Sequence, residues 1–254
     1  MTLEGTMLMP WSTGVSAGLS AAAALGLAGG GCAYAAMWPG SQLFGSALIA
    51  PRRPGELALT FDDGPNPACT PRLLDILASH DAHATFFMLG SFAQQQPDLV
   101  RRILAAGHLI GNHSWSHPNL ALTPARLVDE ELTRTRETLQ QIAGAPIRYF
   151  RPPFGGRRPY VLKAARRLGM VPVTWNAMTN DWAEPLADAT AGRLIRMIDR
   201  LERQGSASNI VLHDGNHRQL NADRKASVSD AEKLLARYKA TNRFVTLDAW
   251  SERT

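Results

Sequence analysis

Beyond Pro54 the chain alternates short apolar runs with longer stretches of helical periodicity. This alternation is typical of βα units that build a parallel sheet. The apolar runs predict seven strands: Leu57–Phe61, Ala84–Leu89, His108–Asn112, Ile147–Phe150, Val171–Trp175, Asn209–His213 and Phe244–Leu247. Because parallel strands are joined by right-handed crossovers, we expect an α/β fold in the form of a deformed (β/α) barrel of about seven strands. An open doubly wound sheet is the alternative.

Helix signals lie between these runs. Thr70-Pro71 predicts a helix start with Thr70 as N-cap, and Thr123-Pro124 opens a longer helix that runs to Gly144. Further helices are predicted over Pro97–Ala106, Tyr160–Leu168, Ala191–Arg203 and Ser229–Tyr238. All parallel strands direct their C-terminal ends at one face, so residues that follow different strands converge there.

The N-terminus has a different pattern. No charged residue occurs from Gly5 to Pro51, and the Ala/Gly-rich stretch Val15–Met37 is long enough to cross a bilayer as one apolar helix. We expect residues 1–50 to form a membrane anchor or signal, and residues 51–254 to form one catalytic domain. The alternative is a flexible apolar arm, because the segment lacks the basic start of a standard export signal.

The expected location follows from this segment. It predicts contact with a membrane and a membrane-associated or exported protein whose catalytic domain lies outside the cytoplasm. Arg52 and Arg53 point the other way, since a positive-inside count places them in the cytoplasm, but they lie some distance past the expected helix end. The orientation therefore stays open.

Composition and charge narrow the class of protein. A hydrophobic content of 45% with 19% charged residues is ordinary for a globular chain. The net charge is +5, and because Glu4 is the only charged residue before Arg52, the region beyond Pro51 carries +6, which suits an anionic polymer or membrane surface. No concentrated basic run with interleaved aromatic residues occurs, so we expect no nucleic-acid partner. The two cysteines, Cys32 and Cys69, define no disulfide framework.

Chemically active residues follow five of the predicted strands. They are Asp62-Asp63, His113 with His117, Arg151, Asp181-Trp182 and His213. Each has an ordinary structural explanation when taken singly, such as the turn chemistry of Asp-Gly-Pro. Their joint placement at one face favours a metal site. Two histidines and one carboxylate are a familiar catalytic zinc set that leaves a position open for water.

The same residues match the motifs of a known family. TFDDGP at residues 60–65, HSWSH at 113–117, RPPF at 151–154, MTNDW at 178–182 and VLH at 211–213 occur in the family's order. Over residues 55–250 the chain resembles polysaccharide deacetylases with a NodB homology domain, also called carbohydrate esterase family four. Met178 and Val211 depart from the acid and the leucine that the last two motifs usually carry.

The resemblance implies a metal and a base. Asp63, His113 and His117 would hold a divalent metal, with Zn²⁺ as the default and Co²⁺, Ni²⁺ or Mn²⁺ as alternatives. Asp62 would be the general base that activates the attacking water, and Arg151 would orient Asp62.

The resemblance also implies an acid and a substrate groove. His213 would protonate the leaving amine, with Asp181 holding it, and the backbone N–H of Phe154 would help to stabilise the oxyanion. Phe154 and Trp182 are expected to contact the sugar ring. Val211 and Leu212 are expected to line a small pocket for the acetyl methyl. For these four residues ordinary core packing is the alternative.

The function expected from the resemblance is metal-dependent removal of N-acetyl groups from the amino sugars of a polysaccharide. Peptidoglycan, a chitin-like polymer and an exported glycan all remain open as substrates, since loops choose among them. One rival is an O-acetyl polysaccharide esterase, because the same water attack serves an ester. The other is a degenerate, non-catalytic glycan-binding domain.

Overall fold

A single curled parallel sheet forms the centre of the computed structural model, which describes residues 29–182 and 187–251. The strand order is β5-β4-β3-β2-β1-β7-β6, and β8 pairs with the start of β1. The strands are β1 Glu56–Gly64, β2 Thr85–Met88, β3 Leu109–Asn112, β4 Tyr149–Phe150, β5 Val171–Pro172, β6 Ala177–Met178, β7 Ser208–His213 and β8 Arg243–Phe244. The predicted deformed barrel is confirmed as a half-barrel, with β5 and β6 at the two ends of this order.

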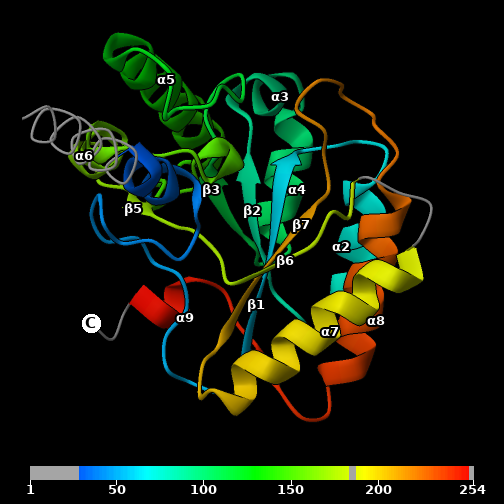
Figure 1. Ribbon diagram of the computed structural model, residues 1–254. Helices are drawn as coiled ribbons and strands as arrows, with labels where there is room; N and C mark the ends of the chain where they lie inside the picture. Colours follow the sequence, from blue (N-terminus) through cyan, green and yellow to red (C-terminus); the bar gives the residue numbers. More distant parts are fainter. Residues whose placement is uncertain (1–28, 183–186, 252–254) are drawn as a thin grey trace, which may run out of the picture.

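Helices surround the curled sheet, as Figure 1 shows. They are α2 Thr70–Ser79, α3 Gly90–Gln95, α4 Pro97–Ala105, α5 Ala125–Ala143, α6 Pro159–Arg167, α7 Ala187–Arg203, α8 Lys225–Tyr238 and α9 Asp248–Ser251, with a 3-10 turn, η1, over Pro153–Gly155. The helices α2, α7 and α8 pack together on one flank, and α5 packs against α3, α4 and α6 on the other. Together they cover the apolar outer face of the sheet.

The central strand β1 places the two adjacent aspartates. Eight of its nine residues are buried, because β2 and β7 pair with it on both sides. Its register sets Asp62 opposite His213 of β7 and Phe87 of β2. Residues distant in the sequence therefore meet at one end of the sheet, as expected for parallel strands.

Residues 29–50 lead into the sheet. Residues 29–37 are helical, Leu48 forms a parallel bridge to Val173, and the buried Arg157 donates hydrogen bonds to the carbonyl oxygens of Trp38 and Ser41. This packing ties the chain before β1 to the edge of the sheet at β5. Most of the predicted apolar helix Val15–Met37 lies outside the described residues. Within the described residues, no helix is both long and apolar enough to span a bilayer.

Several predicted boundaries shift, and some elements are missing from the prediction. The N-cap of α2 is Cys69 rather than Thr70, because the Thr70 hydroxyl instead contacts Asp214 and the backbone N–H of Asn66. The helix α5 begins at Ala125 and ends as expected, with Gly144 in the left-handed conformation. The elements α3, β6 and α9 have no counterpart among the predicted elements. Each has six residues or fewer, which is too short for a periodic signal.

Candidate active site

The predicted residues gather at the C-terminal ends of the strands. Asp62 and Asp63 end β1, His113 follows β3, Arg151 follows β4 and His213 ends β7. Asp181 follows the unpredicted strand β6, rather than following β5 directly. A cavity of about 550 Å³ opens here. Asp62, Asp63, His117 and His213 are among the residues that line it.

The buried side chain of Arg151 fixes the position of the Asp62 carboxylate. The fully buried guanidinium donates hydrogen bonds to Asp62 Oδ1 at 2.8 Å and to Thr60 Oγ1 at 2.7 Å. A further one reaches Asn209 Oδ1 at 3.2 Å. Burial lowers the pKa of Arg151, and the Asp62 carboxylate opposes that shift. Oδ2 of Asp62 faces His113 Nε2 at 3.8 Å, so one carboxylate oxygen is fixed while the other points toward the histidines.

Asp63 is surrounded by imidazole nitrogens. Its Oδ1 lies 3.2 Å from His117 Nε2 and 3.6 Å from His113 Nε2, and its Oδ2 lies 3.7 Å from His217 Nδ1. Donor atoms from Asp63, His117 and His217 all lie within 4.8 Å of one another. Bonds of about 2.0–2.2 Å to a shared cation place two ligand atoms roughly 3–4 Å apart, so these spacings fit one metal ion.

Two buried atoms lack partners at this place. Neither Asp63 Oδ1 nor His117 Nδ1 has a hydrogen-bond partner within the described chain. An unsatisfied buried carboxylate oxygen beside the His113 and His117 imidazoles is costly unless a cation completes it. His113 Nδ1 lies 2.8 Å from the carbonyl oxygen of Arg151; if it donates to that oxygen, Nε2 is left free to act as a ligand. The residues present therefore fit a divalent metal.

The protonation states agree with this fit. Burial would raise the pKa of Asp63, but His217, His117 and His113 outweigh it and hold that pKa well below its ordinary value. Burial, together with His113, lowers the pKa of His117 to about 3. A charged carboxylate and a neutral imidazole are the forms that bind metal.

The pKa of His213 is shifted in the opposite direction to that of His117. Its Nδ1 lies 2.8 Å from Asp181 Oδ1, and its backbone N–H donates to Asp181 Oδ2 at 2.8 Å. Ser227 on α8 donates to the same Oδ2 at 2.5 Å. Burial by itself lowers the pKa of His213, yet Asp181 outweighs this effect and raises it to about 9. His213 is therefore protonated at neutral pH.

Aromatic side chains wall part of the cavity. Phe154, half exposed in the left-handed conformation, lies edge-on against His117 with ring centroids 4.5 Å apart. Trp182 is 43% exposed and meets His213 edge-on at 4.7 Å. Val211 and Leu212 are fully buried within β7, and neither is among the described residues that line the cavity. Their contact with the acetyl methyl stays a prediction.

The sequence interpretation missed three residues at this site. His217 was assigned a structural role for lack of a motif, although it stands four residues after His213 just as His117 stands four after His113. Its ring stacks on His117 at 4.3 Å. Ser227 and Asn209 had no signal, since each acts through Asp181 or Arg151 rather than on the cavity.

Comparison with known proteins gives one family throughout. The family model described as polysaccharide deacetylase matches residues 50–173. A peptidoglycan-N-acetylglucosamine deacetylase of Bacillus cereus is 36% identical over 209 residues, which cover 81% of this chain and 72% of the relative. A chitooligosaccharide deacetylase of Bradyrhizobium sp. (strain ANU 289) is 40% identical over 158 residues, or 62% of this chain and 69% of the relative.

A solved structure agrees with these relatives. The crystal structure of a peptidoglycan N-acetylglucosamine deacetylase in complex with a naphthalenyl N-oxidanyl-benzamide superposes with a TM-score of 0.70 at 34% identity. The match covers 82% of this chain and 93% of that one. Asp181 and His213 lie beyond the residues that the family model matches, so their pairing is known from the geometry above.

Proposed function

This chain belongs to the family of polysaccharide deacetylases, and from that premise we propose that it removes N-acetyl groups from the amino sugars of a polysaccharide in a metal-dependent hydrolysis. The relatives act, by their names, on chitooligosaccharides and on peptidoglycan N-acetylglucosamine. Deacetylase activity on such a glycan is therefore supported by homology. The observation that carries the finer proposal is the pairing of an Arg151-held Asp62 with the Asp63–histidine cluster, beside a protonated His213.

The proposed metal ligands are Asp63, His113 and His117, with Zn²⁺ as the default occupant. When bound, the cation would polarise the acetyl carbonyl and acidify the attacking water. His217 is a further donor within reach of Asp63 and His117. Replacing His113 or His217 singly by Ala, followed by measurement of metal stoichiometry, separates the two histidines: the one that is a ligand loses metal.

Asp62 is proposed as the general base. Its Oδ1 is fixed by Arg151, and its Oδ2 lines the side of the cavity where the histidines converge. That oxygen is placed to take the proton of a water attacking the acetyl carbon. Because Asp63 would bind the cation, Asp62 is the one of the two adjacent carboxylates that remains available as a base.

His213 is proposed as the general acid. Departure of an amine from the tetrahedral intermediate needs a proton, and protonated His213, oriented by Asp181, supplies one. The backbone N–H of Phe154 is proposed as a donor to the oxyanion, and Phe154 with Trp182 as apolar walls for the sugar ring. An amide substrate makes the acid step demanding, whereas an ester with a better leaving group depends on it less.

The test is acetate release from N-acetylglucosamine oligomers by the full chain, before chelation, after chelation and after addition of Zn²⁺. We expect release that disappears with the chelator and returns with metal. O-acetylated xylan serves as the parallel substrate. Release from xylan alone would replace this proposal by an esterase, and absence of release from both, with metal bound, would support a glycan-binding domain.

We also propose that the uncharged N-terminal segment associates the protein with a membrane or directs its export. The proposal is supported by the length of the apolar stretch Val15–Met37 and by the location of the relatives' glycan substrate, peptidoglycan, in the cell wall. Cell fractionation tests it. Recovery of the whole chain from the cytosol after a high-speed spin would contradict both membrane association and export.

A further inference from the structure

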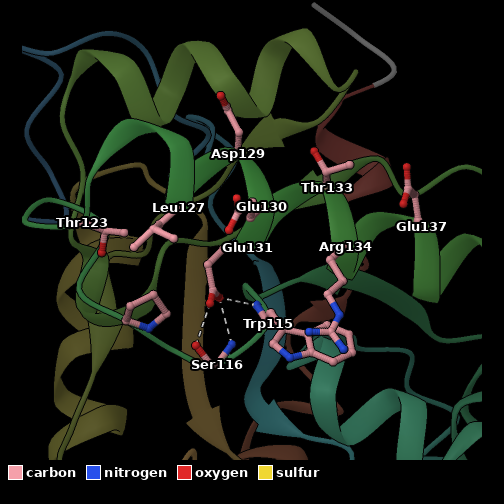
Figure 2. A pocket seen from close by; sticks show the side chains of 11 residues that line it. Trp115, Ser116, Thr123, Leu127, Asp129, Glu130, Glu131, Thr133, Arg134 and Glu137 are labelled. Carbon is pink, nitrogen blue, oxygen red and sulfur yellow. Dashed lines mark hydrogen bonds between the residues drawn. The ribbon is translucent and has the colours of Figure 1, made fainter.

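One acidic side chain outside the catalytic cavity holds the loop that carries two of the proposed ligands. Glu131 on α5 accepts hydrogen bonds through Oε2 from the backbone N–H groups of Trp115, at 2.7 Å, and Ser116, at 2.9 Å. Its Oε1 accepts the hydroxyl of Ser116 at 2.6 Å. Figure 2 shows this carboxylate reaching from the helix to the loop. Trp115 and Ser116 lie between His113 and His117 in the sequence.

The loop needs such support because its backbone is unfavourable. Ser114 has φ of 69° and His117 has φ of 63°, so two residues with side chains adopt the left-handed conformation within four positions. Conformations of this kind cost of order 1 kcal/mol or more each and persist only where the surroundings fix them. Inside the loop, the Ser114 hydroxyl accepts the His117 N–H at 3.0 Å.

A second hydrogen bond connects α5 to this part of the chain. Asn112, the last residue of β3, donates through its side-chain amide to the carbonyl oxygen of Leu132 at 2.9 Å, and its Oδ1 accepts the N–H of Ser114 at 2.8 Å. Glu131 and Leu132 are consecutive on α5. The entrance and the middle of the ligand loop are thus both bound to one turn of this helix.

The helix α5 is itself held in place by the burial of one of its faces. Val128, Leu132, Thr135 and Leu139 are buried along one face of α5, as helical spacing predicts. Arg134 lies over the Trp115 ring at 3.5 Å, which closes the outer side of the loop. The position of the loop therefore follows that of α5.

We propose that Glu131 is a positioning residue that fixes the separation and direction of the His113 and His117 imidazoles toward a shared cation. It touches neither substrate nor cation, and acts through the backbone between the two histidines. The inference rests on the proposed metal site. Loss of such an outer partner typically weakens metal affinity by about 10–100-fold.

The test compares Glu131→Ala and Glu131→Gln with Glu137→Gln, a change at an exposed acid on the same helix that lines the same pocket. The readouts are Zn²⁺ affinity by competition with a chelating dye, the visible spectrum of the Co²⁺-loaded protein, and hydrogen exchange at the amides of Trp115 and Ser116. Unfolding of the metal-free protein is measured alongside.

For Glu131→Ala we expect Zn²⁺ affinity to fall about tenfold or more, an altered Co²⁺ spectrum and faster exchange at both amides. Glu131→Gln keeps an oxygen that accepts both amides, so we expect it to recover most of the affinity. The Glu137→Gln protein should match the wild type in all three.

Unchanged affinity and spectrum in the alanine variant would overturn the positioning role, as would an equal loss in Glu137→Gln. If the alanine variant does not fold, Glu131→Asp takes its place, because the shorter side chain keeps the charge but draws the carboxylate away from the amides of Trp115 and Ser116. Weakened Zn²⁺ affinity in that variant supports the role, and wild-type affinity overturns it. A wild-type protein that binds metal but releases no acetate fails the proposed function alone. One without metal affinity overturns the positioning role as well.

Discussion

At the scale of single residues, the tasks proposed for the two adjacent aspartates can be tested separately. In Asp62→Asn the side chain keeps its shape and its bond to Arg151, while Asp63 and the histidines are untouched. We expect stoichiometric metal with kcat/KM lowered at least about hundredfold, since a positioned base contributes that much or more. Metal analysis and acetate release on one preparation check this. His117→Ala is the contrast, because it should lose both metal and activity.

The pH profile reports on His213. Because Asp181 raises the pKa of His213 to about 9, the acid form persists through neutral pH and is lost as pH rises through that value. Asp181→Asn removes the charge, so the pKa falls and the alkaline limb of kcat/KM should move to lower pH by about one unit or more. A limb that stays in place when Asp181 is neutral would show that another group controls it.

Residue chemistry at the ends of strands is readable from sequence, even for Arg151 and Asp181, which act from behind the cavity. Residue chemistry that helices supply from behind is not. Asp62, Asp63 and His213 were predicted because the C-terminal ends of parallel strands all lie at the same edge of the sheet. Glu131 and Ser227 were not, since each sits on a helix whose side-chain direction depends on how that helix packs. His217 was missed for a different reason: it lies in the loop after β7, and the sequence does not indicate how that loop folds.

At the scale of elements, the junction between the end of β1 and the loop after β7 requires a residue without a side chain. A Cβ at Gly215 would overlap the carbonyl oxygen of Asp63, which is backbone and cannot turn aside. We expect Gly215→Ala to lower the free energy of unfolding by about 1–3 kcal/mol and to weaken metal binding, because Asp63 must shift.

The matched control is another glycine in a roomy setting. Gly192 lies inside α7, and a Cβ there meets Arg196 only at an ordinary 3.6 Å. Gly192→Ala should therefore raise the free energy of unfolding by about 0.5–1 kcal/mol, opposite in sign to Gly215→Ala. Chemical denaturation of both variants checks the pair, and a stabilised Gly215→Ala protein would contradict the close approach.

The elements themselves were largely predictable. All seven expected strands are present and parallel, because buried parallel strands have a strong apolar signal. Their ends were less accurate: the run Val171–Trp175 yields a two-residue strand and then a turn toward β6. The curl of the sheet into a half-barrel depends on how neighbouring helices pack, which no single segment encodes.

At the scale of the molecule, residues 29–50 are part of the folded body. Arg157 is buried and donates to the carbonyl oxygens of Trp38 and Ser41, and Leu48 packs against a cluster of buried apolar residues that includes Val173. A domain beginning at residue 51, as the sequence suggested, would lack these contacts. Its boundary stays a prediction.

We expect a protein that begins at residue 51 to unfold at a temperature at least about 5 °C lower than one that begins at residue 29. The lost hydrogen bonds to a charged group are worth about 1.5–3 kcal/mol each, and each kcal/mol shifts the midpoint by about 2–4 °C at this size. Differential scanning calorimetry of the two proteins decides it. Equal midpoints would mean that residues 29–50 contribute little to stability.

The pairing of β1 with β7 also sets an order in time. Asp62 stands opposite His213 in the sheet, about 150 positions later in the chain. During synthesis the ribosome delivers the two members of that pair at different moments, the proposed base first and the proposed acid long after it. The proposed catalytic pair is therefore incomplete until most of the polypeptide has emerged, so we expect a nascent or prematurely terminated chain to lack the proposed hydrolytic activity.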